Sequence, residues 1–284
     1  MSLALAGNYL LQYLYSHLDL PQYTVLNLVT ALCRITRLGW LDSEELTTLV
    51  DRATAMLQVS PQHCALSLQI LSQLTVEINM QPATRVGSRY RRASSQFRDR
   101  QLQGVFQVGL NILRSLISQG DVSHSRLLEN CMQLIKNCLS YDFIGTMIDE
   151  SVDDAGTVQL PTSWRSMFDD GSVIAMFFEA YARLPPMFSS QAMECLVLVA
   201  SFRRALFNSD AERIRFLSCT TLFFVALHAN GLSSAALLNG SYQVLNTGAG
   251  LDNQSNFHET CRFLSRYAAS FFLSFSISNP RVAL

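Results

Sequence analysis

The densest group of carboxylates in the chain is a short acidic cluster, formed by Asp149, Glu150, Asp153 and Asp154. Carboxylate oxygens are the ligands that calcium prefers. An EF-hand loop beginning at Asp149 would need glycine at its sixth position and glutamate at its twelfth, but Asp154 and Leu160 stand there. The spacing therefore excludes an EF-hand, and we expect neither a metal ion nor another cofactor.

Known catalytic motifs do not occur in the sequence. His258 and Glu259 begin like a zinc-protease motif, but Arg262 stands where the second histidine is required. There is no P-loop, no Gly-x-Ser-x-Gly and no Gly-x-Gly-x-x-Gly. We therefore expect no catalytic residues, and the chain is not predicted to be an enzyme.

A group of arginines precedes Ser94 in an otherwise polar stretch. The sequence Arg91-Arg92-Ala93-Ser94 matches the pattern that basophilic kinases phosphorylate, which makes Ser94 a candidate phosphosite. The alternative is a polar loop between two repeats. Only Tyr90 and Phe97 accompany the arginines, too few aromatic residues for a stacking platform, so no nucleic acid is expected as a partner.

The composition is unusually apolar. Of 284 residues, 49 % are hydrophobic and only 15 % are charged, against about 25 % charged in an ordinary domain. Such a chain has a continuous core, or faces that normally meet something else. Seven cysteines without a Cys-x-x-Cys pair favour a reducing compartment. The sequence shows no signal peptide and no apolar run of about 20 residues, so we expect no membrane insertion.

Helical periodicity runs through most of the sequence and recurs with a period near 40 residues. The first expected helix runs to about His17, and the second is marked by Leu26 to Leu38 and closed by Gly39. Further helices are expected after Asp42 or Ser43 and at Pro61, Leu102 and Ser125. Three more cover Val173–Leu184, Ser189–Phe207 and Asp210–Ala229, and a last one covers Phe257–Phe275. The predicted segments are HEAT-type repeats at 1–80, an Arg-rich inter-repeat segment at 81–100, a HEAT-type repeat at 101–141, an acidic signature loop at 142–162, HEAT-type repeats at 163–230 and a divergent C-terminal segment at 231–284.

Several irregular blocks of sequence identify a family. They read RITRLGWLD from Arg34, SQLTVEIN from Ser72, SSQFRD from Ser94, NCLSYDFIGT continuing to PTSWRSMF from Asn137 to Phe168, and, more weakly, YARLPPMF, SFRRALFN and AERIRFLS between Tyr181 and Ser218. In this order they resemble the exportins, nuclear export receptors of the importin-β (karyopherin) superfamily. The likeness fades after Ser218, which indicates either a divergent member or an altered terminal exon.

The resemblance implies an all-α fold, a right-handed α-solenoid of HEAT-type repeats forming part of an ARM/HEAT superhelix. It also implies Ran-GTP-dependent protein export, with protein cargo and nucleoporins as partners and shuttling between nucleus and cytoplasm through the nuclear pore. Arg34 and Arg37 would then lie on the concave face that binds Ran and cargo; the alternative is favourable charge at a helix C-terminus. Asp149, Glu150, Asp153 and Asp154 would either contact a partner or form a solvated loop.

The resemblance covers a part of such a receptor, so we expect a fragment or truncated member. Its first helix is apolar and would lack the neighbour on which it packs, and we expect weak or no Ran-GTP binding by this chain alone. The alternative function is a helical scaffold for protein partners without transport activity. For the acidic loop we expect a non-helical path from Asp142 to Pro161, with Trp164 buried as the anchor that holds its return.

Overall fold

The fold is all-α, as a computed structural model of the chain shows. It describes residues 2–80, 87–119, 125–143, 158–209, 211–213, 216 and 261–265. Of these residues 81 % are helical and none lies in a strand. One isolated parallel bridge joins Val158 to Phe202. The predicted all-α helical-repeat fold is confirmed.

The chain forms two compact units. The N-terminal unit comprises Met1–Leu116 and Asp121–Met147, and the C-terminal unit comprises Ile117–Gly120 and Ile148–Leu284. Each of the two tryptophans of the chain lies in a different unit, Trp40 in the first and Trp164 in the second. Each unit therefore carries its own fluorescent reporter of folding.

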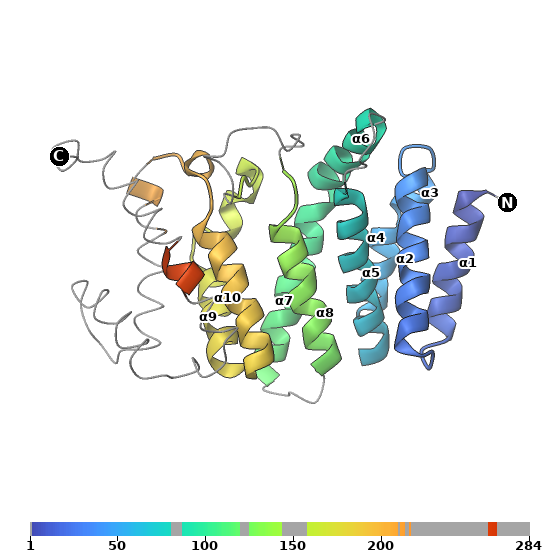
Figure 1. Cartoon of the computed structure of the whole chain (residues 1–284), viewed down its shortest axis with the longest axis horizontal. Coiled ribbons are helices and arrows are strands. Elements are labelled where there is room, and N and C mark those ends of the chain that lie inside the picture. Colours follow the sequence, from blue (N-terminus) through green and yellow to red (C-terminus); the bar gives the residue numbers. More distant parts are fainter. Residues whose placement is uncertain are drawn as a thin grey trace. The chain divides into compact units, whose positions relative to one another are not determined.

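Helix pairs build the N-terminal unit. Helix α1 (Leu3–Ser16) packs on α2 (Gln22–Gly39), and α4 (Leu49–Met56) packs on α5 (Pro61–Asn79). Helices α7 (Gln103–Gln119) and α8 (Ser125–Leu139) approach closely at Gly109, whose carbonyl accepts a hydrogen bond from Cys131 Sγ at 3.2 Å. The second members α2, α5 and α8 lie side by side in that order (Figure 1). This is the stacking by which HEAT-type pairs bury their apolar faces.

The third expected helix is broken in two. It appears as α3 (Glu44–Thr47) followed by α4, with a turn at Thr48, and Ser43 makes no capping hydrogen bond through its side chain. The hydroxyls of Thr47 and Thr48 donate to the carbonyls of Glu44 and Glu45, each at 2.7 Å. Such local side-chain bonds compete with the helical ladder, which explains the interruption.

Helical structure before α7 begins much earlier than Leu102, where the sequence pattern predicted it. Helix α6 (Gly87–Phe97) runs directly into a π-helical turn, η1 (Arg98–Leu102), and then into α7. The periodicity was too sparse to reveal α6, because among residues 88–97 only Ala93 and Phe97 are buried. Its arginines extend from an otherwise polar helix, and long charged side chains cover apolar surface without creating an apolar pattern.

Helices α9 (Ser172–Arg183) and α10 (Pro186–Ala200) pack against each other in the C-terminal unit. Short 3₁₀ helices flank them, η4 (Thr162–Met167) before and η5 (Arg204–Leu206) after. The sequence predicted a start at Ser189 for α10, but it begins at Pro186, because proline suits the first helical position. Gly171 precedes α9 with φ 68°, a left-handed conformation that favours glycine. Most of the expected helices at Asp210–Ala229 and Phe257–Phe275 lie outside the described residues.

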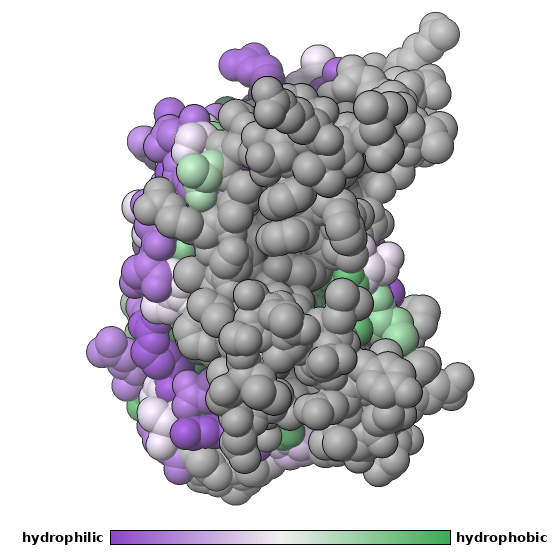
Figure 2. Space-filling view, turned by 90° about the vertical axis from the view of Figure 1, so that its left-hand side faces the viewer, coloured by the Kyte–Doolittle hydropathy of each residue, from purple (hydrophilic) through white to green (hydrophobic). Residues whose placement is uncertain are grey.

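The described surface is mixed. In the view of Figure 2, hydrophilic residues predominate along one edge and hydrophobic ones form small separate patches. Near the N-terminus, α1 and α2 expose several large apolar side chains, among them Leu5, Tyr9, Tyr23 and Leu26. Across the described ranges no helix is both long and apolar enough to cross a membrane. In the same ranges no group of three acidic, histidine or cysteine side chains is placed to hold a metal ion.

Candidate partner-binding surface

Arg34 and Arg37 both reach the same carboxylate. Arg34 Nε lies 3.2 Å from Glu77 Oε1, and Arg37 Nη1 lies 3.4 Å from Glu77 Oε2. Arg37 also donates to the Glu77 carbonyl at 3.1 Å, and its guanidinium stands over the Tyr90 ring at 4.9 Å. The Glu77 side chain is 2 % exposed, Arg37 16 % and Arg34 65 %. Arg37 therefore ties α2 to α5, whereas Arg34 remains accessible to a partner.

Polar pairs continue from α5 to α8. Asn137 Nδ2 donates to Ser72 Oγ at 2.8 Å, and Asn130 Nδ2 donates to the Ala65 carbonyl at 2.9 Å. The amide of Gln73 reaches Glu77 at 3.2 Å. We call this line of contacts across α2, α5 and α8 the polar seam; its members are Arg34, Arg37, Ala65, Ser72, Gln73, Glu77, Asn130 and Asn137. The seam fixes the register of the three second helices, because each of its bonds between two helices requires one alignment.

Glu77 is not among the contact residues that the sequence predicts. A signal was present: a glutamate interrupts an otherwise apolar helix stripe near Ile78. Buried glutamates are nearly always paired, so a basic partner on a neighbouring helix was to be expected. Which arginines supplied it could not be read from the sequence.

An aromatic junction joins the blocks RITRLGWLD, SSQFRD and NCLSYDF. Trp40 packs edge-on against Phe97 at 5.6 Å between ring centroids, and Phe97 lies 6.0 Å from Tyr141. Tyr141 in turn meets Phe143 edge-on at 5.8 Å. Arg98 donates to the Phe143 carbonyl at 2.6 Å. Residues far apart in sequence thus fix the first residues of the acidic signature loop.

Ser94 belongs to this junction. Its Oγ lies 2.7 Å from the hydroxyl of Tyr141, which also lies 2.9 Å from the Ser94 carbonyl, and Ser94 is half-buried. Phosphorylation of Ser94 stays a prediction. A phosphate there would have to displace the Tyr141 hydroxyl, so the modification would act by loosening the aromatic junction.

Replacing Tyr141 by phenylalanine should destabilise the N-terminal unit at neutral pH and do so less at high pH. At pH 8 the variant loses the bonds to Ser94, worth about 0.5–1.5 kcal/mol. Burial raises the pKa of the Tyr141 hydroxyl above its ordinary value. As the pH rises, Tyr141 ionises in the unfolded chain at a lower pH than in the folded one. The stabilisation of the folded state by the neutral hydroxyl is therefore fully present below about pH 10 and is lost as the pH rises toward the folded pKa.

The measurement is urea unfolding of both proteins at pH 8 and pH 10.5. At pH 10.5 the difference between them should have narrowed by about 0.8 kcal/mol for an unfolded pKa near 10. The other tyrosines and the cysteines ionise in both proteins, so their effects on the free energy of unfolding cancel in the difference. A difference that stayed constant across this range would contradict the buried, neutral state of Tyr141.

Trp164 and Arg165 hold the other end of the signature loop. Trp164 is 1 % exposed, which confirms the predicted burial. Arg165 Nε donates to the Leu206 carbonyl and Arg165 Nη1 to Asn208 Oδ1, each at 2.6 Å. Glu212 Oε2 accepts a hydrogen bond from the backbone N–H of Asn208 at 2.8 Å. The block PTSWRSMF is therefore clamped onto the segment that follows α10.

A backbone bridge supports the same clamp. The Val158 amide donates to the Ser201 carbonyl, and the Arg203 amide donates to the Val158 carbonyl, each at 3.0 Å. Phe168 stands edge-on to Phe202 at 4.9 Å. Asp142, Phe143 and residues 158–161 are non-helical, as expected. The four acidic residues Asp149, Glu150, Asp153 and Asp154 lie outside the described residues.

These contacts define a helical-repeat protein, in which pairs of helices stack through polar and aromatic junctions. No protein-family model matches the chain. It is 39 % identical over 93 % of its length to Exportin-7-A of Xenopus laevis, 36 % over 96 % to Ran-binding protein 16 of Drosophila melanogaster, and 33 % over 93 % to Ran-binding protein 17 of Homo sapiens.

The chain spans about a quarter of the length of these relatives, 23 % of the first and 24 % of the second. It is homologous to part of the exportin-7 and Ran-binding protein 16/17 proteins, and the resemblance to exportins is confirmed.

Proposed function

We propose that the chain is a segment of a nuclear export receptor, a Ran-GTP-dependent carrier that moves protein cargo through the nuclear pore. The observation that carries the proposal is the similarity over nearly the whole chain to proteins named exportin and Ran-binding protein. The stacked helix pairs support it, because a helical-repeat surface offers extended faces for protein partners. Such a receptor has no catalytic step and shuttles between nucleus and cytoplasm.

The proposed partner face is the exposed side of α2 at the polar seam. Arg34 presents a guanidinium that is 65 % exposed yet oriented by Glu77. An arginine held in this way binds a carboxylate of a partner with less loss of side-chain entropy than a free one. Arg37 takes an indirect part, since it supports Glu77 from a more buried position. Contacts of Asp149, Glu150, Asp153 and Asp154 with basic cargo, and contacts with nucleoporins, belong to the same proposal.

In this mechanism Ran-GTP and cargo bind to one receptor, and each raises the affinity of the other. Reciprocity of this kind follows from thermodynamic linkage when both partners favour the same arrangement of repeats. Hydrolysis of the GTP bound to Ran then removes this mutual stabilisation, and the cargo is released in the cytoplasm. The chain would contribute part of the Ran or cargo contact, and the remaining repeats of a longer receptor would contribute the rest.

Retention of Ran by the immobilised chain tests the proposal. We expect weak or no binding by the chain alone, and any retention that is measured should favour Ran-GTP over Ran-GDP several-fold. Arg34→Gln should reduce retention of the GTP form about fivefold or more, because a charged hydrogen bond to a partner contributes about 1.5–3 kcal/mol, discounted for its exposure. The matched control is Arg183→Gln, which removes an arginine that is 62 % exposed and paired with Glu179 at 2.9 Å.

Equal retention of the two nucleotide forms, or of neither, would contradict direct Ran-GTP recognition by this chain. Partner binding that ignores the nucleotide, with no enrichment at the nuclear rim, would instead favour a helical scaffold without transport activity. An equal loss in Arg34→Gln and Arg183→Gln would show that net charge, not the polar seam, governs retention.

A further inference from the structure

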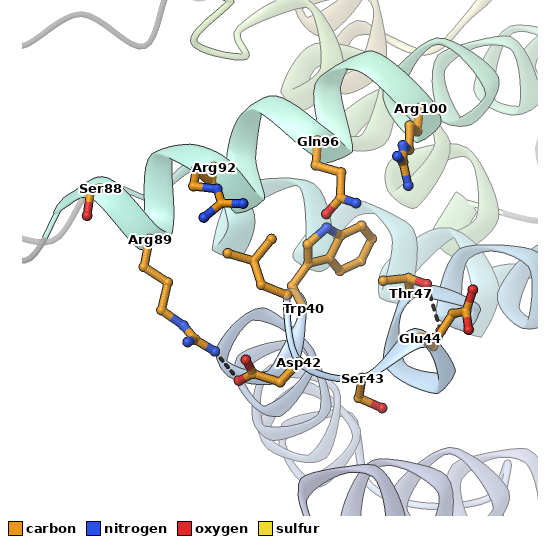
Figure 3. A pocket seen from close by; sticks show the side chains of 11 residues that line it. Trp40, Asp42, Ser43, Glu44, Thr47, Ser88, Arg89, Arg92, Gln96 and Arg100 are labelled. Carbon is orange, nitrogen blue, oxygen red and sulfur yellow. Dashed lines mark hydrogen bonds and ion pairs between the residues drawn. The ribbon is translucent and has the colours of Figure 1, made fainter.

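An open hollow lies beside α6 in the N-terminal unit. One wall is the turn from Trp40 to Thr47, and the other is α6 with the beginning of η1. The hollow has a volume of about 670 Å³. Figure 3 shows Arg92, Gln96 and Arg100 projecting from the helix toward this turn.

Positive charge dominates its walls. Arg89 pairs with Asp42, whereas Arg92 and Arg100 have no ion-pair partner among the residues that the structure describes. A smaller hollow shares Leu41, Arg92 and Gln96 with the first and adds a further arginine, Arg91. Together the two hollows present four arginines against two acidic side chains, those of Asp42 and Glu44. We call this pair of hollows the α6 groove.

Two polar atoms at the base of the groove lack partners. Trp40 is 3 % exposed and its indole N–H reaches no acceptor, and Gln96 Oε1 receives no hydrogen bond. The Gln96 amide is turned toward the Trp40 indole in Figure 3. Buried polar groups are nearly always paired in folded proteins. A bound peptide carries carbonyl acceptors for the indole N–H and backbone N–H donors for Gln96 Oε1, so its docking can give each of the two atoms a partner.

We propose that the α6 groove binds an extended acidic segment of a partner protein. Arg89, Arg92 and Arg100 occupy one side of a helical run, and the rise of about 1.5 Å per residue places the first and last about 16 Å apart. An extended peptide covers that distance with about five residues. Carboxylates are the natural partners of guanidinium groups, which bind them in a planar, two-pronged geometry. The inference stands whether or not the chain serves nuclear export.

The groove suits a peptide better than a nucleic acid. Single strands bind where bases stack on free aromatic faces. Trp40 is buried against Phe97, and the ring of Tyr90 is covered by the Arg37 guanidinium. The described lining therefore offers charge without a stacking platform.

Fluorescence polarisation with a labelled hexapeptide of alternating Glu and Asp tests the proposal on the full chain. Reversing two charges, in Arg92→Glu with Arg100→Glu, should weaken binding at least tenfold. The matched control reverses Arg114 and Arg126, two exposed arginines of the same unit outside the groove, and should change binding less than threefold. A hexapeptide of Gln and Asn should not bind.

A second variant guards against loss through misfolding. Asp42→Asn frees Arg89 from its internal partner, so acidic-peptide binding should tighten about threefold. Failure of the acidic peptide to bind, or an equal loss in the groove and control variants, would overturn the proposal. So would stronger displacement of the peptide by a poly-U hexanucleotide than by unlabelled peptide. Since none of these assays contains Ran, their failure leaves the export proposal to its own test.

Discussion

Replacing Trp164 by alanine is expected to lower the free energy of unfolding of the C-terminal unit by about 3–5 kcal/mol. Trp164 is 1 % exposed and is among the largest fully buried side chains of the described residues. Its removal leaves a cavity where η4 meets the segment after α10, and Arg165 beside it loses the support that holds its bonds to Leu206 and Asn208. Trp164→Phe keeps most of the volume and should cost less than half as much.

Hydrogen exchange measured by mass spectrometry separates local from global effects. In Trp164→Ala the amides of α9 and α10 should exchange faster, while those of α1 and α2 stay unchanged. Trp40→Ala is the matched control, a buried tryptophan of the other unit at 3 % exposure, and should give the converse pattern. Unchanged exchange in α9 and α10 after loss of Trp164 would refute its role as the anchor of the signature loop.

Removing the buried carboxylate of Glu77 is the change with the largest expected effect on the N-terminal unit. Glu77→Leu should destabilise it by about 3–5 kcal/mol, because Arg37 is then left largely buried without its counter-charge. Glu77→Gln keeps the shape and part of the hydrogen bonding, and should cost less. Urea unfolding of both variants is followed by tryptophan fluorescence in a Trp164→Phe background, where Trp40 is the only tryptophan and reports on the unit concerned.

A double variant makes the Glu77 prediction specific. Combining Glu77→Leu with Arg37→Met replaces the pair by apolar side chains, and should recover most of the lost stability. Arg34→Gln alone should cost under about 1 kcal/mol, since Arg34 is 65 % exposed and solvent screens its pair. If the double variant were as unstable as the sum of its parts, the destabilisation would come from packing rather than from an uncompensated charge.

Most of the helices could be predicted from the sequence because their signals are local. Ser60 before Pro61 is a cap followed by a favoured first residue, and α5 begins there as expected. Gly39 and Ser125 also mark helix boundaries where the pattern placed them. Helix α6 could not be predicted in this way, because periodicity detects only helices with a full apolar stripe and α6 lacks one.

The family blocks were visible in the sequence, but their purpose was not. Ser94 looked like a phosphosite, and Arg34 and Arg37 like an equivalent pair of contact residues. The structure sets Ser94 against Tyr141, buries Arg37 on Glu77 and leaves Arg34 accessible. The burial of a single side chain depends on which helices stack beside it, and the sequence of one chain does not show which helices these are.

The sequence by itself determined the helical class, the helix boundaries set by caps and breakers, the apolar anchor Trp164 and the likeness to exportins. Only the tertiary structure decided that Glu77 binds both arginines, that Arg165 clamps the segment after α10, and that the turn at Trp40 faces α6 across a groove. Helix formation depends on residues three or four positions apart. These contacts join residues about 40 positions or more apart, whose meeting follows from the packing of whole helices.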